Sequence, residues 1–319
     1  MATLDSQNGP PTLLTRRGDG FVAIGVDTIW TSPDGIAWHV AATTGIDGVV
    51  VDFVERSDGS LLAFGYADGE PIDALLTWSS PDGVTWREAD AGLPQSSVFV
   101  DIARGDLGYL LAAHALSNDG GPNPYQLWYS PDAVSWELVR DSEVVDEAIS
   151  AVGAGPQGFV AVGQQGWQSN DFRAFVVASS DGRNWIDAPA DDGILSEVGS
   201  LWTIAPLGGD WLTAPLTVGT EMPVLWSANG LEWKRLTSMP IERSDVGAML
   251  SFFSDGLRIY SDLVDGGGRP LGRSVLWTSV DAVDWTESPI PRAEHQLGFA
   301  TTNGVTVFLV DGTVYVHRE

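Results

Sequence analysis

The heptapeptide Ser80-Pro81-Asp82-Gly83-Val84-Thr85-Trp86 occurs in six variants along this chain of 319 residues. The first serines of successive variants are 48, 50, 49, 48 and 52 residues apart. A period near 49 residues indicates one supersecondary unit built repeatedly, and this predicts a repeat architecture before any other property is considered. The other five variants are Ser32-Pro33-Asp34-Gly35-Ile36-Ala37-Trp38, Ser130-Pro131-Asp132-Ala133-Val134-Ser135-Trp136, Ser179-Ser180-Asp181-Gly182-Arg183-Asn184-Trp185, Ser227-Ala228-Asn229-Gly230-Leu231-Glu232-Trp233 and Ser279-Val280-Asp281-Ala282-Val283-Asp284-Trp285.

The chemistry of the heptapeptide is that of a tight turn between two strands. An Asp or Ser oxygen accepts hydrogen bonds from backbone N–H groups two residues further on. Glycine takes a positive φ at no steric cost, and the closing Trp lays a large apolar face over the turn. Asn229 keeps the turn chemistry, whereas Ala133 and Ala282 stand where the other variants have glycine. We therefore expect these two turns to differ locally.

The pattern Ser-x-Asp-x-Gly-x-x-Trp resembles the Asp-box, or BNR repeat, of sialidase-like β-propellers. The resemblance covers residues 28–288 with six copies in phase. It implies an all-β fold, a β-propeller of four-stranded antiparallel blades. It also implies that the boxes lie on the rim, away from the active face, so their role is structural.

Each period reads as four short strands separated by turn residues. In the unit 49–89 the expected strands are 49–55, 61–66, 74–78 and 84–88. The same order recurs at 97–139, 147–188, 198–236 and 245–288, and a compact first blade spans 12–41.

Three further strands are expected near 296–302, 305–310 and 313–317, and the chain ends where a seventh turn would follow. A three-stranded blade would leave an exposed edge. We predict that residues 1–8 close it, with 2–7 pairing with the last strand. This gives seven blades in a single domain, 1–319; six blades is the alternative, if the C-terminal strands merge with the first blade.

The composition indicates which classes of binding partner the protein can have. The net charge of −27 and a single lysine, Lys234, oppose binding to nucleic acid or to anionic membranes and permit cationic partners or Ca²⁺. The chain has no cysteine and no apolar run of membrane-spanning length. We expect a monomer without membrane insertion. The start Met1-Ala2 lacks a signal peptide, and we expect a secreted or surface protein whose leader is absent from this chain, with a cytoplasmic protein as the alternative.

Topology indicates where a ligand would bind. The links from second to third strand and from one blade to the next open on one side of a blade, and they are long and irregular. We call this side the long-loop face; the first hairpins and the repeated turns open on the other side, the turn face. On the long-loop face we predict ligand contacts from Trp167, Arg269, Arg273 and His295. Trp167 offers an apolar plane in a polar loop, and the arginines follow Gly266-Gly267-Gly268.

Two other kinds of site remain open. Asp52 and Asp101 are 49 residues apart in the first strands of successive blades, and Ser150 continues the phase, so these residues are expected to line the central channel. They would form a hydrated pore or a ligand or ion site. No cofactor is predicted apart from a Ca²⁺ site, for which carboxylates are available at Asp119, Asp191, Asp192, Asp262, Asp265 and Glu294.

A sialidase activity is not favoured. The family resemblance implies three arginines, a Tyr nucleophile with a Glu partner, an acid Asp, and an Arg-Ile-Pro motif near the N-terminus. The motif is absent here; Tyr66 with Glu70 could imitate the pair, and the arginines that could reach the long-loop face are Arg243, Arg269, Arg273 and Arg292. The prediction is therefore a non-catalytic binding module with a carbohydrate or protein ligand on the long-loop face. The alternatives are a glycoside hydrolase or polysaccharide lyase that uses carboxylates there, and an assembly scaffold.

Overall fold

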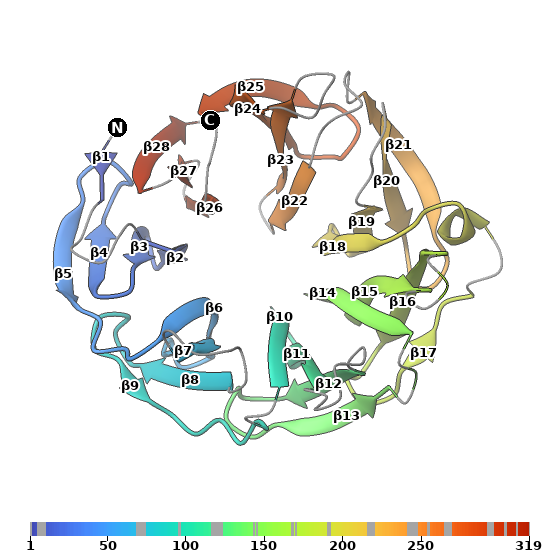
Figure 1. Cartoon of the computed structure of the whole chain (residues 1–319), viewed down its shortest axis with the longest axis horizontal. Helices are drawn as coiled ribbons and strands as arrows, with labels where there is room; N and C mark the ends of the chain where they lie inside the picture. The colour runs from blue at the N-terminus through green and yellow to red at the C-terminus, as the bar shows by residue number, and fades with distance from the viewer. Residues whose placement is uncertain are drawn as a thin grey trace. The chain divides into compact units, whose positions relative to one another are not determined.

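The structure is a computed structural model of residues 1–319 (Figure 1). It describes residues 2–4, 11–67, 75–94, 97–115, 124–142, 144, 146–166, 169, 171–189, 193–215, 221–240, 248–253, 256–264, 270–291, 297–302, 305–310 and 312–318. In parts of these ranges, chiefly 248–274, it describes the backbone alone.

The described residues form seven four-stranded antiparallel sheets, and they group into two compact units. The first unit, residues 1–95 and 292–319, holds three sheets. Their strands are β2 (Leu13–Arg17), β3 (Gly20–Ile24), β4 (Thr28–Ser32) and β5 (His39–Thr43); β6 (Val49–Glu55), β7 (Leu61–Tyr66), β8 (Leu75–Ser80) and β9 (Arg87–Glu88); and β26 (Leu297–Thr302), β27 (Val305–Val310), β28 (Thr313–Arg318) and β1 (Ala2–Thr3).

The second unit, residues 96–291, holds four sheets. Their strands are β10 (Ser97–Gly105), β11 (Gly108–Ala115), β12 (Tyr125–Ser130) and β13 (Glu137–Asp141); β14 (Glu147–Gly155), β15 (Gly158–Gln165), β16 (Arg173–Ser179) and β17 (Ile186–Asp187); β18 (Leu201–Leu207), β19 (Asp210–Pro215), β20 (Glu221–Ser227) and β21 (Lys234–Pro240); and β22 (Ala248–Phe253), β23 (Gly256–Val264), β24 (Pro270–Ser279) and β25 (Thr286–Pro291). A short 3₁₀ helix, Gly193–Ser196, precedes β18.

The predicted all-β class and the four-stranded antiparallel sheets are confirmed, and there are seven sheets rather than six. In each sheet the strands follow chain order from first to fourth, except that β1 occupies the fourth place beside β28. We number the blades one to seven in chain order, so that blade seven contains β26–β28 and β1.

The burial of the strands explains their sequences. The second strands are covered on both faces, so they read as near-continuous apolar runs: Leu61 to Gly65 of β7 are all buried. The fourth strands stand at the outer edge; both residues of β9 and both of β17 are exposed. The core lies between neighbouring sheets, as where Tyr129 of blade three meets Phe159 of blade four edge to face at 5.9 Å.

The repeated turns have the geometry expected of them. The Asp82 Oδ1 atom accepts the N–H groups of Val84 at 2.9 Å and Thr85 at 2.6 Å, and Trp86 Nε1 donates to the Gly83 carbonyl at 3.1 Å. Gly83 has φ +73°, the left-handed conformation that favours glycine.

The expectation that the alanine-containing turns differ locally is wrong. Ala133 and Ala282 adopt φ of +56° and +63°, and Asp132 and Asp281 accept the same pair of backbone N–H groups as Asp82 does. The hydrogen bonds of the turn outweigh the left-handed strain of one alanine, which is about 1–2 kcal/mol.

The N-terminus pairs with the C-terminal strand. Ala2 lies opposite Val314 and Thr3 opposite Thr313, and the Leu4 N–H donates to the Gly312 carbonyl at 2.7 Å. Figure 1 shows β1 beside β28, and the Leu4 side chain is buried with Val314 in the same apolar cluster. Residue 1 and residues 5–8 of the proposed closing segment lie outside the described residues.

Within the part of the chain that the structure describes, no helix has the length and hydrophobicity needed to cross a membrane.

Candidate functional site

Three of the four predicted ligand-contact residues, Trp167, Arg269 and His295, lie outside the described residues. Arg273 lies on β24, where its backbone pairs with Pro291, and its side chain is not described. The carboxylates considered for Ca²⁺ also fall on undescribed residues or side chains: Asp119, Asp191, Asp192, Asp262, Asp265 and Glu294. The structure therefore bears on the described residues of the loop 165–173 and not on these four side chains.

A hollow of about 220 Å³ lies on the long-loop face of blade four, at the loop that contains Trp167. It carries two carboxylates and one guanidinium, so its net charge is negative. Its lining residues are Asp146, Gln165, Gly166, Ser169, Asp171 and Arg173.

The loop that forms this hollow folds back on itself. Gly166 has φ +98°, and a Cβ at this position would lie 2.0 Å from the carbonyl oxygen of Asp171, so only glycine fits. The Gly166 N–H donates to the carbonyl of Asp146 at 3.1 Å, and Ser169 Oγ donates to the Gly166 carbonyl at 3.2 Å. The guanidinium of Arg173 contacts the carboxylate of Asp171 at 2.7 Å, with both side chains exposed. The backbone thus shapes the hollow, and charged side chains line its rim.

A polar cluster joins blade three to blade four beside this loop. Arg140 donates through Nε to the Tyr125 hydroxyl at 2.5 Å and through a terminal nitrogen to Asp187 at 2.6 Å. Burial raises the pKa of Tyr125 to about 12, so the hydroxyl stays protonated. Burial also raises the pKa of Glu147, although the hydroxyl of Ser142, at 3.1 Å from Glu147 Oε2, opposes the shift. Each of these side chains already holds a partner, and the cluster supports the blades rather than facing an open cavity.

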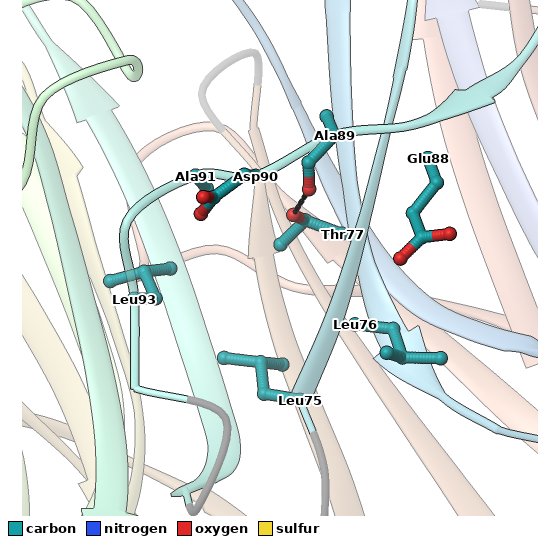
Figure 2. A pocket seen from close by; sticks show the side chains of 8 residues that line it. All are labelled: Leu75, Leu76, Thr77, Glu88, Ala89, Asp90, Ala91 and Leu93. Carbon is teal, nitrogen blue, oxygen red and sulfur yellow. Dashed lines mark hydrogen bonds between the residues drawn. The ribbon is translucent and has the colours of Figure 1, made fainter.

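A second hollow, of about 170 Å³, lies on the long-loop face of blade two (Figure 2). It lies between β8 and the link that follows β9, and the Thr77 hydroxyl donates to the Ala89 carbonyl to hold the link in place. Its walls combine leucine side chains with the carboxylates of Glu88 and Asp90; Asp90 also accepts the N–H of Gly92 at 2.8 Å. This hollow, like that of blade four, is therefore acidic.

The proposed channel residues lie on first strands, and Asp101 links two blades. Its Oδ1 atom accepts the Ile102 N–H at 2.8 Å, and its Oδ2 atom accepts the Val152 N–H, on the first strand of the next blade, at 2.9 Å. Although the residue keeps some exposed surface, the surrounding protein raises the pKa of Asp101 to about 6 by desolvation. Asp52 makes the equivalent contact to its own following residue, Phe53, at 2.7 Å.

The register places the third channel residue differently. The first strands of blades two to five each carry a bulge, and the residues that follow it are Asp52, Asp101, Ala151 and Thr203. Ser150 is therefore the bulged residue, and Ala151 occupies the position of the two aspartates. The spacing from Asp101 to its counterpart is 50 residues rather than 49, because the repeats differ in length.

The same bulge reveals a residue that the sequence reasoning missed. Trp202 is the bulged residue of β18 and is 49% exposed. Because a bulge interrupts the alternation of a strand, a tryptophan within it need not be buried. In the earlier repeats the same position holds Val51, Val100 and Ser150. The tryptophan can be recognised as unusual only when the strand register is known.

The described residues contain no group of three or more His, Asp or Glu side chains placed to hold a metal ion. What the described long-loop faces offer is carboxylates, hydroxyls and amides around open hollows, which is suited to binding through hydrogen bonds and ion pairs.

Comparison with known proteins gives matches of fold. No family model matches the chain, and no curated protein matches it. Virginiamycin B lyase from Staphylococcus aureus, solved as an inactive variant with quinupristin, is 11% identical over 99% of this chain and 96% of its own, with a TM-score of 0.61. YCF48 bound to a D1 peptide is 14% identical over 99% of this chain and 93% of its own, with a TM-score of 0.57. The match in the mitotic checkpoint complex is 10% identical over 100% of this chain and 93% of its own, with a TM-score of 0.57.

The fold is a seven-bladed β-propeller. At these identities the likeness shows the fold alone, and enzymes and binding proteins are both found among propellers of this kind.

Proposed function

We propose that this propeller is a non-catalytic module that binds a cationic peptide segment of a partner protein on its long-loop face. The observation that carries the proposal is the acidity of the two hollows described there. The hollow of blade four holds Asp146 and Asp171, and that of blade two holds Glu88 and Asp90. The net charge of −27 would attract a basic partner at long range and repel an acidic one.

Binding is favoured over catalysis because, within the described residues, the two carboxylates of raised pKa hold the scaffold together. Asp101 accepts two backbone N–H groups, and Glu147 lies against Ser142 in the cluster that joins blades three and four. A glycoside hydrolase or lyase would need such groups to face a substrate. Among propellers of similar fold, YCF48 bound to a D1 peptide is an example of peptide binding, and an assembly scaffold is one form of the function proposed here.

Several finer assignments belong to the same proposal. We infer that the six repeated turns are Asp-boxes of the sialidase-like type. In every copy the Asp or Asn side chain accepts two backbone N–H groups, and the fourth residue has a positive φ. A secreted or surface-exposed monomer fits an acidic chain without cysteine. Trp167, which follows Gly166 in the sequence of the blade-four loop, would supply the apolar contact for the peptide.

The proposal can be tested with a display library of random peptides selected on the intact protein. We expect enrichment of peptides rich in Lys and Arg. Their affinity, measured by fluorescence anisotropy, should fall about tenfold in Asp146→Asn, since a hydrogen bond to a charged group contributes about 1.5–3 kcal/mol.

The matched control is Asp106→Asn, which removes the same charge from an exposed first-hairpin turn on the turn face. An equal loss in both variants would mean that only overall charge matters and would contradict a site on the long-loop face. Enrichment of neutral or acidic peptides would contradict the proposed ligand.

A further inference from the structure

A third hollow, in blade five, is not used by the proposed function. It has a volume of about 410 Å³ and lies at the turn face, beside the repeated turn 227–233. Its lining residues are Trp226, Ala228, Asn229, Glu232, Trp233 and Lys234. The volume falls in the range of about 300–1,000 Å³ that is usual for small-molecule sites.

The repeats provide an internal comparison that explains why the hollow is found here. Trp226 is the residue before the first serine of the turn, and the other five repeats have a smaller side chain there: Thr31, Ser79, Tyr129, Ala178 and Thr278. Four of these five cannot form an aromatic wall. The tryptophan is therefore particular to blade five and is not a requirement of the turn.

Blade three, the other repeat with an aromatic residue here, shows how the space can be filled. Tyr129 lies opposite Glu137 across the strand pair, and Arg183 from the turn of blade four lies over its ring at 4.3 Å and pairs with Glu137 at 2.9 Å. The guanidinium thus covers the tyrosine.

In blade five no counterpart of Arg183 reaches across from the next turn, and a hollow remains beside the tryptophan. Trp226 lies opposite Lys234, and the counterpart of Arg183 in the next turn is Val283, which is 53% exposed. The ammonium of Lys234 lies 4.2 Å from the centroid of the Trp226 ring, so the cation comes from the same blade.

Both indole rings are held in place. Trp226 Nε1 donates to Asp210 Oδ2 at 2.9 Å, and Trp233 Nε1 donates to the Gly230 carbonyl at 3.0 Å. The rings therefore present apolar surface without losing further rotational freedom when a ligand binds. Glu232 and Lys234 are exposed at the rim and supply one acceptor and one donor group.

We propose that this hollow is a saccharide-binding site, independent of the long-loop face. A sugar ring has an apolar face for the indole of Trp233, and its hydroxyl groups can donate to Glu232 and accept from Lys234. A cationic ligand fits less well, because the ammonium of Lys234 already lies over the face of the Trp226 ring. An anionic ligand fits less well, because Glu232 lies in the hollow and the whole chain is strongly acidic.

The test is a calorimetric titration of the full chain with three neutral probes: maltohexaose, cellohexaose and xylohexaose. We expect at least one to bind at millimolar concentration or tighter. Glu232→Gln and Lys234→Gln should each weaken that binding about tenfold, because each removes a hydrogen bond made by a charged group. Both side chains are exposed, so these variants should fold as the wild type does.

Arg87→Gln is the matched control, since Arg87 is the blade-two counterpart of Lys234 and lies opposite Ser79 rather than a tryptophan. The affinity of the Arg87→Gln variant for the same probe should equal that of the wild type. The proposal is overturned if none of the three probes binds, if neither blade-five variant weakens binding, or if Arg87→Gln weakens it equally. Binding of inorganic phosphate at the same site in place of the sugars would overturn the ligand class.

Discussion

Replacing Trp86 by alanine tests the structural role assigned to the repeated turns. Trp86 is 7% exposed and packs in a cluster with Leu61 and Trp78 of its own blade and with Val22 of blade one. A buried aromatic side chain hides about 150–250 Å², which at about 25 cal/mol per Å² corresponds to about 4–6 kcal/mol. Alanine retains a small part of this, and the lost hydrogen bond to Gly83 adds about 1 kcal/mol.

We therefore expect Trp86→Ala to lower the free energy of unfolding by about 3–5 kcal/mol, the usual cost of truncating a buried aromatic residue. Urea denaturation followed by circular dichroism measures it, and peptide affinity of the folded fraction should be unchanged. Trp38→Ala is the matched control, because Trp38 makes the same bond to Gly35 at 2.8 Å but is only half-buried, so its loss should be smaller. A change under about 1 kcal/mol for Trp86→Ala, or an equal loss at Trp38, would refute the burial argument.

Three further predictions follow from the turns and from the blade junction. Gly182→Ala should lower the melting temperature by several degrees, because a Cβ would lie 2.4 Å from Tyr129 Cδ2 at a φ of +76°; an unchanged melting curve would contradict the requirement for glycine. The pKa of Asp82 is lowered to about 2, chiefly by the N–H of Thr85, so the contribution of this carboxylate to stability is present above pH ~4 and is lost as the pH falls toward 2. Asp82→Asn should therefore be less stable than the wild type at pH 7 and should approach its stability at pH 2. A stability difference independent of pH would contradict this linkage. The pKa of Asp101 is raised to about 6, so between pH ~4 and 6 this carboxyl holds a proton in the folded state that it loses in the unfolded state. Its contribution to stability therefore falls as the pH rises through this range. A carboxyl carbon resonance of Asp101 that titrates below pH 4 would contradict the raised pKa.

The fold could be predicted from the sequence because the same weak turn pattern occurs six times at a regular spacing. One Ser-x-Asp-x-Gly turn predicts only a hairpin, but six copies in phase predict six blades, and the three strands after residue 296 predict a seventh. The strands Val49–Glu55 and Leu61–Tyr66 coincide with the ranges expected from their apolar runs. The fourth strand β9, with two residues, is shorter than the expected 84–88, because a fourth strand is exposed at the sheet edge and has no burial pattern to mark its ends.

The candidate site residues were harder to predict from the sequence, because bulges and loops interrupt the repeat of about 49 residues. The alignment of Ser150 with Asp101 followed a spacing of 49 residues, whereas the register puts Ala151 there. The alanine turns were expected to deviate because the strain of Ala133 was considered without the hydrogen bonds that offset it. The hollow beside Lys234 depends on the absence of a covering side chain from the next blade, and only the structure of the neighbouring turn reveals this.

The most direct test of the account is hydrogen–deuterium exchange of the intact protein, with and without a saturating cationic peptide selected from the display library. We expect slower exchange in the long-loop segments 142–147 and 165–173 of blades three and four, and no change at the repeated turns. Protection confined to the turns, such as 80–86 and 130–136, would place the peptide on the opposite side of the blades and would contradict the assignment of function to the long-loop face.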